Sequence, residues 1–139
     1  MDQIKVIQQH LIDADGVSGV LSAGWRAFEL VRIVTDASAG QTADMYPAFT
    51  FARGAAVSGR NAVAFAPSLP TDCVPCPGIP GPVTRDVYEI ADAVAELASV
   101  LSRRLREAAG FAADADDRVA CQNAASDAEQ ISRLLAKGE

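Results

Sequence analysis

The sequence predicts an all-α protein, a four- or five-helix bundle with a C-terminal antiparallel helical hairpin and a Pro-rich connecting loop. Apolar residues recur every three or four positions in several segments, the spacing of one helix face. Aromatic residues make up only 6% of the chain, so Ala, Val, Leu and Ile must form most of the core. Prolines gather in one stretch, which a long helix cannot cross. We therefore expect one domain, with a helical unit at 1–66, a Pro/Cys-rich segment at 67–83 and a hairpin at 84–139.

The N-terminal residues 2–14 predict a short amphipathic helix. Ile4, Ile7, Leu11 and Ala14 fall on one face at spacings of three and four. Asp15-Gly16 is expected to end this helix, because glycine accepts the left-handed conformation found after helix ends.

Residues 18–38 predict a second helix on the evidence of their polar positions. Ser22, Arg26, Glu29, Arg32 and Asp36 follow a helical rhythm rather than an alternation of two. The opposite face carries the apolar side chains Trp25, Phe28, Leu30, Val31 and Val34.

Residues 42–66 allow two interpretations. We favour a helix with Asp44 as N-cap and Pro47 in the first turn, where a missing N–H leaves no bond unmade. Small residues from Ala52 to Gly59 would give this helix a smooth surface for a neighbouring helix to cross. The alternative takes MYPAFTFAR and NAVAFA as paired strands, which would make the protein α+β with a small antiparallel sheet in residues 25–66.

The C-terminal hairpin carries the clearest pattern. Thr84 is the expected N-cap of its first helix, and the following apolar stripe is Val87, Ile90, Val94, Leu97 and Leu101. Gly110 is expected to end that helix, with Phe111 folding back onto the last turn. The second helix opens at Asp114, where negative charge is favourable, and its stripe is Cys121, Ala124, Ala128, Ile131 and Leu135. A short loop makes the two helices antiparallel neighbours.

The acidic balance argues against nucleic acid as a partner. The net charge is −6, whereas phosphate binders need a clustered basic face. The one dense basic run contains Arg103, Arg104 and Arg106, and we interpret it as a helix C-terminus whose macrodipole favours cations. Neither a signal peptide nor an apolar run long enough for a bilayer is apparent, so we expect a cytoplasmic protein without a membrane partner. An Ala-, Asp- and Arg-rich composition suggests a bacterial source.

Cys73-Val-Pro-Cys76 is the most specific local motif. Its spacing suits two thiolate ligands of one zinc ion, and His10 and Cys121 are the other residues available for a Cys₃His set. A redox pair is a second possibility, although the Pro-rich continuation prevents a helix from starting at Cys76 and lowering a thiol pKa. We favour inert thiols, with Cys121 as a small buried hydrophobe on an apolar stripe.

A weaker constellation lies on the two central helices of the first half. Trp25, Glu29, Arg32, Arg53 and Arg60 would converge if those helices are antiparallel neighbours. The functional interpretation is a small pocket for an anionic or polar ligand. The structural interpretation, which we favour, is a salt-bridge network between helices or a set of solvated faces.

Function is the least determined property. The chain contains no Gly-x-Ser-x-Gly elbow, Walker loop or Glu-x-x-His pair, so we lean away from an enzyme. Our first hypothesis is a non-catalytic helical interaction or accessory module that self-associates as a homo-oligomer or binds a protein partner. The alternative is a small-molecule or zinc-binding protein that uses the CxxC segment or a pocket between the central helices.

Overall fold

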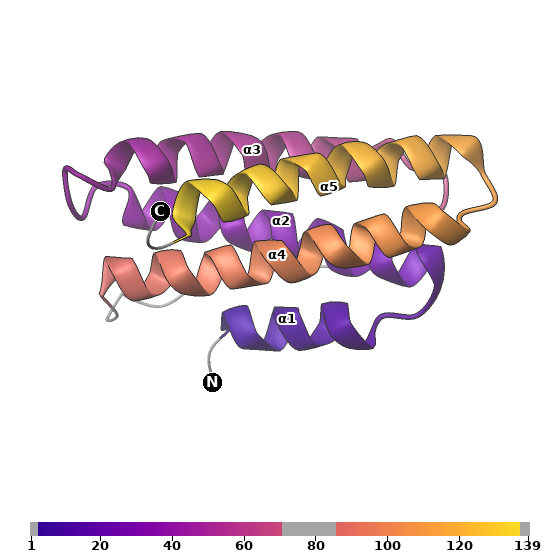
Figure 1. The fold of residues 1–139 in the computed structure, drawn as a ribbon, viewed down its shortest axis with the longest axis horizontal. Coiled ribbons are helices and arrows are strands. Elements are labelled where there is room, and N and C mark those ends of the chain that lie inside the picture. Colours follow the sequence, from indigo (N-terminus) through magenta and orange to yellow (C-terminus); the bar gives the residue numbers. More distant parts are fainter. Residues whose placement is uncertain (1–2, 71–85, 137–139) are drawn as a thin grey trace.

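The computed structural model describes residues 3–70 and 86–136, which form five helices (Figure 1). They are α1 (Gln3–Asp13), α2 (Gly16–Ser38), α3 (Tyr46–Ala64), α4 (Val87–Phe111) and α5 (Ala115–Leu135). The all-α prediction is confirmed. The alternative with a sheet is wrong, because residues 46–64 form one helix and the described ranges contain no strand.

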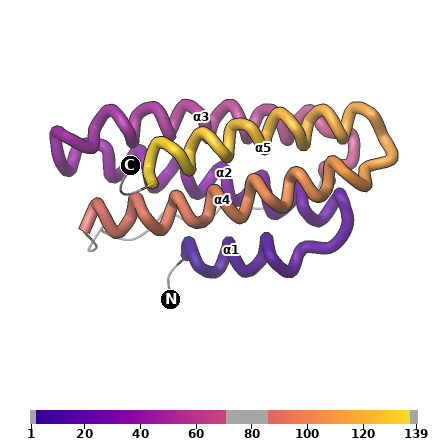
Figure 2. Tube along the Cα trace, in the orientation of Figure 1, coloured from indigo at the N-terminus to yellow at the C-terminus, as the bar shows by residue number. Residues whose placement is uncertain are grey.

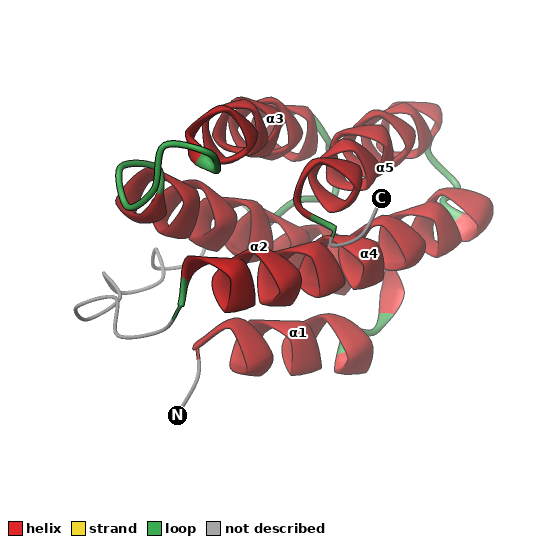
Figure 3. Cartoon of the chain, turned by 60° about the vertical axis from the view of Figure 1, so that its left-hand side comes forward, coloured by secondary structure: helices red, strands yellow, loops and turns green. Residues whose placement is uncertain are grey.

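Four of the helices form the bundle, and α1 lies outside it. α4 packs against α5 and α2, and α3 packs against the same two helices. α1 packs against α4 and α2, on the side away from α3 and α5 (Figure 3). Figure 2 shows that the chain reverses direction between α1 and α2, between α2 and α3, and between α4 and α5. Each of these pairs is therefore an antiparallel hairpin.

Some of the helix ends lie where the sequence predicted them. Gly16 adopts φ 73° between α1 and α2, as the Asp15-Gly16 pair predicted. Asp114 caps α5 by accepting bonds from the N–H groups of Asp116 and Asp117, at 2.7 and 3.3 Å. Thr84, the expected cap of α4, lies outside the described residues. The observed N-cap is Asp86, which accepts from the Tyr88 N–H at 2.7 Å.

Two predicted caps are wrong. Met45, rather than Asp44, occupies the N-cap position of α3, with Pro47 in the first turn as expected. The Asp44 carboxylate instead accepts a bond from the Tyr88 hydroxyl at 2.6 Å, which joins the start of α4 to the segment before α3. Gly110 lies inside α4, which continues through Phe111 and ends in an extended residue rather than a left-handed one. Phe111 remains 56% exposed.

The core runs the length of the bundle. Its largest fully buried side chains include Phe28, Phe49, Leu97, Leu101 and Ile131, one or more from each bundle helix. Gly59 on α3 leaves room for the Phe28 ring of α2 to lie directly against its backbone. None of the described helices has the length and apolar character needed to cross a membrane.

Candidate functional site

The predicted constellation on α2 and α3 forms an ion-pair cluster around Glu29. This carboxylate is only 4% exposed and accepts bonds from Arg32 at 2.8 and 3.0 Å and from Arg60 at 2.6 Å. The bonds from Arg32 lead the effects that lower the pKa of Glu29 to about 2, against the opposing effect of burial. α2 and α3 are thus joined by a carboxylate that stays ionised at neutral pH.

The other two residues of that constellation lie apart from Glu29. Arg53 pairs with Asp36 at 3.2 Å, and both side chains are exposed. Trp25 is half-buried and packs against the core. The observed contacts are those of a salt-bridge network. That Trp25, Glu29, Arg53 and Arg60 hold a ligand stays a prediction.

The structure tests the hypothesis for Cys121 but not the hypotheses for the Cys73–Cys76 pair. Cys73 and Cys76 lie outside the described residues, so the zinc and redox hypotheses for this pair stay predictions. Cys121 is fully buried on α5, as predicted for a small hydrophobe. Burial, together with the negative charge of Asp117, raises the pKa of its thiol to about 11. Within residues 3–70 and 86–136, His, Cys, Asp and Glu side chains do not gather in threes to form a metal site.

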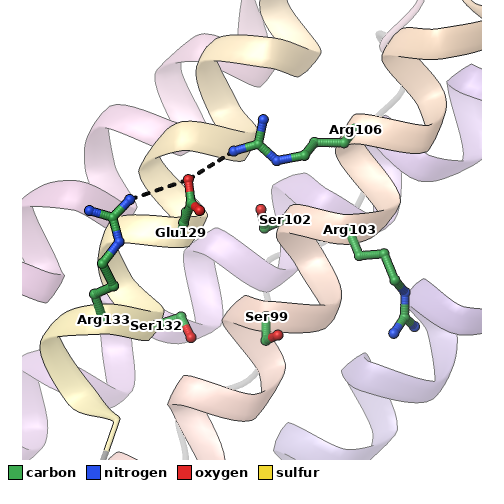
Figure 4. Close-up of a pocket in the computed structure, with 7 residues that line it drawn as sticks. All are labelled: Ser99, Ser102, Arg103, Arg106, Glu129, Ser132 and Arg133. Carbon is green, nitrogen blue, oxygen red and sulfur yellow. Dashed lines mark hydrogen bonds and ion pairs between the residues drawn. The ribbon is translucent and has the colours of Figure 1, made fainter. Parts of the chain in front are cut away.

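A groove between α4 and α5 gathers charged and hydroxyl side chains that are far apart in the sequence. Its volume is about 460 Å³. α4 contributes one wall and α5 the other, with these lining residues: Ser99, Ser102, Arg103, Arg106, Glu129, Ser132 and Arg133 (Figure 4). Three arginines against one glutamate give the groove an excess of positive charge, although the chain as a whole is acidic.

The arginines of the groove converge on one oxygen atom. Arg106 from α4 and Arg133 from α5 both contact Oε1 of Glu129, at 2.9 and 3.3 Å (Figure 4). These three side chains are about half exposed or more. Exposed ion pairs of this kind contribute about 1 kcal/mol or less, so the carboxylate is held weakly.

Three serine hydroxyls lie below this ion-pair cluster. Ser102 is buried in the floor, and Ser99 and Ser132 project from the two walls (Figure 4). None of the three makes a side-chain hydrogen bond within the described part of the chain. Arg103 lies at the edge and points away from Glu129 in the same view. The groove therefore holds hydroxyl groups that have no hydrogen-bond partner among the described residues, beside two guanidinium groups.

The basic run that borders this groove was visible in the sequence, but the prediction that it forms the C-terminus of its helix is wrong. Arg103, Arg104 and Arg106 were interpreted as a helix end, yet α4 continues to Phe111, beyond the run. Arg104 points the other way and donates to the carbonyls of Leu11 and Ala14, at 3.0 and 2.5 Å. It therefore complements the C-terminus of α1 rather than that of α4. Which α5 residues face Arg106 depends on the register of the hairpin, which the pattern did not determine.

A second, smaller groove of about 240 Å³ lies between α1 and α4. Gln8 and Glu96 meet across it, with Nε2 of Gln8 donating to the carboxylate at 3.2 Å. Its charged side chains are one lysine, Lys5, and one glutamate, Glu96. We therefore regard the α4–α5 groove, with its unbalanced charge, as the candidate site.

Comparison with protein-family models, with curated proteins and with solved structures finds no match for this chain.

Proposed function

We propose that the protein is a non-catalytic binding module whose ligand places an oxyanion in the α4–α5 groove. One observation supports this most directly. Arg106 and Arg133 reach from two different helices to a single carboxylate oxygen of Glu129. An oxygen of a bound anion would need this same arrangement of donors.

The chemistry of the groove suits an anion with several oxygens. A guanidinium presents a planar fork of N–H donors that matches carboxylate and phosphate groups. If Glu129 turned out to solvent, both forks would become available, and each of the two exposed pairs would oppose this motion by only about 1 kcal/mol or less. The hydroxyls of Ser99, Ser102 and Ser132 would donate to the remaining ligand oxygens.

Binding without catalysis is the simpler role for these residues. The lining contains neither histidine nor cysteine, and its one carboxylate, Glu129, is paired with two arginines, which makes it a poor base for activating a serine. The surrounding surface of an acidic chain would repel anions elsewhere, which concentrates binding at the groove. A module of this kind is compatible with the interaction hypothesis drawn from the sequence if the anionic group is supplied by a protein partner.

Titration with inorganic phosphate and with succinate, followed by two-dimensional NMR, tests this proposal. Phosphate should shift the amide signals around Ser102 and Arg106. Arg106→Met/Arg133→Met should weaken binding by about 10- to 100-fold, the range expected for lost bonds to a charged group. Glu129→Gln should tighten binding by up to about fivefold, because a competing carboxylate is removed.

Arg53→Met is the matched control, since it removes one exposed arginine that pairs with Asp36 on the other side of the bundle. It should leave the phosphate-induced shifts of the amide signals around Ser102 and Arg106 unchanged. Stronger binding of succinate than of phosphate would assign a carboxylate ligand. Equal shifts in the wild type and the double variant would overturn the proposal.

A further inference from the structure

The break between α1 and α2 depends on two residues. α1 ends at Asp13 and α2 begins at Gly16. Asp15 is extended, with φ −120° and ψ 133°, and Gly16 has φ 73°, a conformation that other L-residues adopt with strain. The sequence from Gln3 to Ser38 contains no proline. Without this turn, no residue in the range would prevent one continuous helix.

The apolar pattern continues in phase across the turn. The stripe of α1 is Ile4, Ile7 and Leu11, and steps of three and four lead on through Ala14, Val17, Leu21, Trp25 and Phe28. In a continuous helix over residues 3–38 this stripe would lie on one side, and the α2 core residues Val20, Ala27 and Val34 would lie on the opposite side. The length of such a helix would be about 54 Å, so the α1 portion would project beyond the end of the bundle.

The surface that α1 covers belongs to α2 and α4. Ile4, Ile7 and Leu11 are buried against these helices, and Gln8 contacts Glu96 of α4. A second copy of the chain offers an identical surface. If α1 moved away from the bundle, its apolar face and the α2–α4 surface that it covers would both be exposed to water. Exchange of α1 between two copies would bury both again.

The direction of the helices fits this exchange. α1 runs antiparallel to α2 (Figure 2). Two long helices related by a twofold axis at residues 14–16 are also antiparallel. Each α1 would then meet the α2 of the other copy in the orientation that it already has within one chain.

We propose that two copies of this protein form a dimer by exchanging α1, with residues 3–38 straightened into one helix in each copy. The surface between α2 and α4 is thus an interaction surface, and its partner is α1 of a second copy. In the exchanged form, the carbonyls of Leu11 and Ala14 accept helical N–H bonds in place of those from Arg104. This goes beyond the proposed oxyanion binding, because α1 does not line the α4–α5 groove.

Gly16→Ala tests the exchange by native mass spectrometry and light scattering across a concentration series. Alanine is strained at φ 73° and favours the straight helix. Since one dimer relieves two such turns, its dissociation constant should fall by about a hundredfold. Gly54→Ala is the control: it makes the same change in the interior of α3, where an added Cβ meets nothing within 4 Å, and should leave the dissociation constant unchanged.

Asp15→Ala provides a second variant that keeps Gly16 and therefore the folded monomer. It should raise the dimer fraction in the same direction but less, because alanine prefers a helix more than aspartate does. Asp15→Gly should lower that fraction. The opposite order for these two variants would contradict the proposal even if Gly16→Ala did not fold.

A zero-length carbodiimide cross-link distinguishes exchange from any other dimer. Gln8→Lys places an amine beside Glu96, the residue that Gln8 contacts at 3.2 Å. In the Gln8→Lys/Gly16→Ala chain the link should join two copies into a covalent dimer, and Glu96→Gln should abolish it. A dimer in which this link stays within one chain, or a Gly16→Ala protein that remains monomeric at high concentration, would overturn the exchange.

Discussion

The contact between Gly59 and Phe28 shows how a single residue determines the packing of two helices. The Phe28 ring is fully buried and lies where a side chain on residue 59 would begin. α3 can approach α2 this closely only because glycine has no Cβ. A residue with low helix propensity is therefore tolerated in the middle of α3.

We expect Gly59→Ala to destabilise the protein by about 1–3 kcal/mol, because the added methyl overlaps the buried Phe28 ring. Urea unfolding measures the change. Gly54→Ala, five residues earlier on an open face of the same helix, should stabilise by about 0.5–1 kcal/mol. Phe28→Leu should recover part of the loss in the Gly59→Ala background. Two alanine variants with equal effects would show that helix propensity, rather than the overlap, is measured.

At the scale of the elements, α1 differs from the other helices. It has few turns, packs against α2 and α4 only at one face, and its C-terminal carbonyls are satisfied from another helix. Arg104 of α4 donates to Leu11 and Ala14 and also pairs with Glu107. One side chain thus ties the end of α1 to the bundle.

Arg104→Met should loosen the end of α1 while leaving α2–α5 folded. The loss of bonds from a charged donor to two carbonyls corresponds to about 1–3 kcal/mol. Limited proteolysis should then cut faster within residues 12–16, and mass spectrometry of the fragments locates the cut. Arg103→Met is the matched control, since Arg103 has no partner in the described part of the chain. Equal cleavage of both variants would rule out this role for Arg104.

At the scale of the whole molecule, carboxylate groups join pairs of helices by hydrogen bonds, in addition to the contacts of the apolar core. Glu29 joins α2 to α3 through Arg60, and the Asp127 carboxylate accepts a bond from Ser58 between α5 and α3 at 3.0 Å. Burial raises the pKa of Asp127, whereas the arginine bonds lower that of Glu29. A lowered pKa means that folding favours the ionised carboxylate, so of the two groups only Glu29 contributes stability that is lost on acidification.

The pH dependence of unfolding should show this. The pKa of Glu29 falls from 4.5 to about 2 on folding, so its contribution is complete above about pH 4.5 and is lost as the pH falls toward 2. The shift corresponds to about 3 kcal/mol. The difference in unfolding free energy between the wild type and Glu29→Gln should thus be larger by about that amount at about pH 7 than at about pH 2. Asp36→Asn, in an exposed pair, should show no such change, and a difference independent of pH would refute the assignment.

Much of the architecture was predictable because it depends on local spacing. The three-and-four rhythm located all five helices, Asp15-Gly16 and Asp114 marked true helix boundaries, and the buried position of Cys121 followed from its stripe. These features depend on neighbours within about one helical turn, which the chain itself specifies.

The candidate site was less predictable because it depends on contacts between helices. The sequence brought Glu29 and Arg60 together correctly but also included Arg53, whose partner is Asp36. The sequence pattern marked Arg106 but did not predict its partners Glu129 and Arg133. It assigned Arg104 to the C-terminus of α4, whereas Arg104 contacts the C-terminus of α1. Charged side chains on a helix face have several possible partners, and the register between helices chooses among them. That register comes from core packing, such as the Phe28 ring against Gly59, which only the assembled bundle contains.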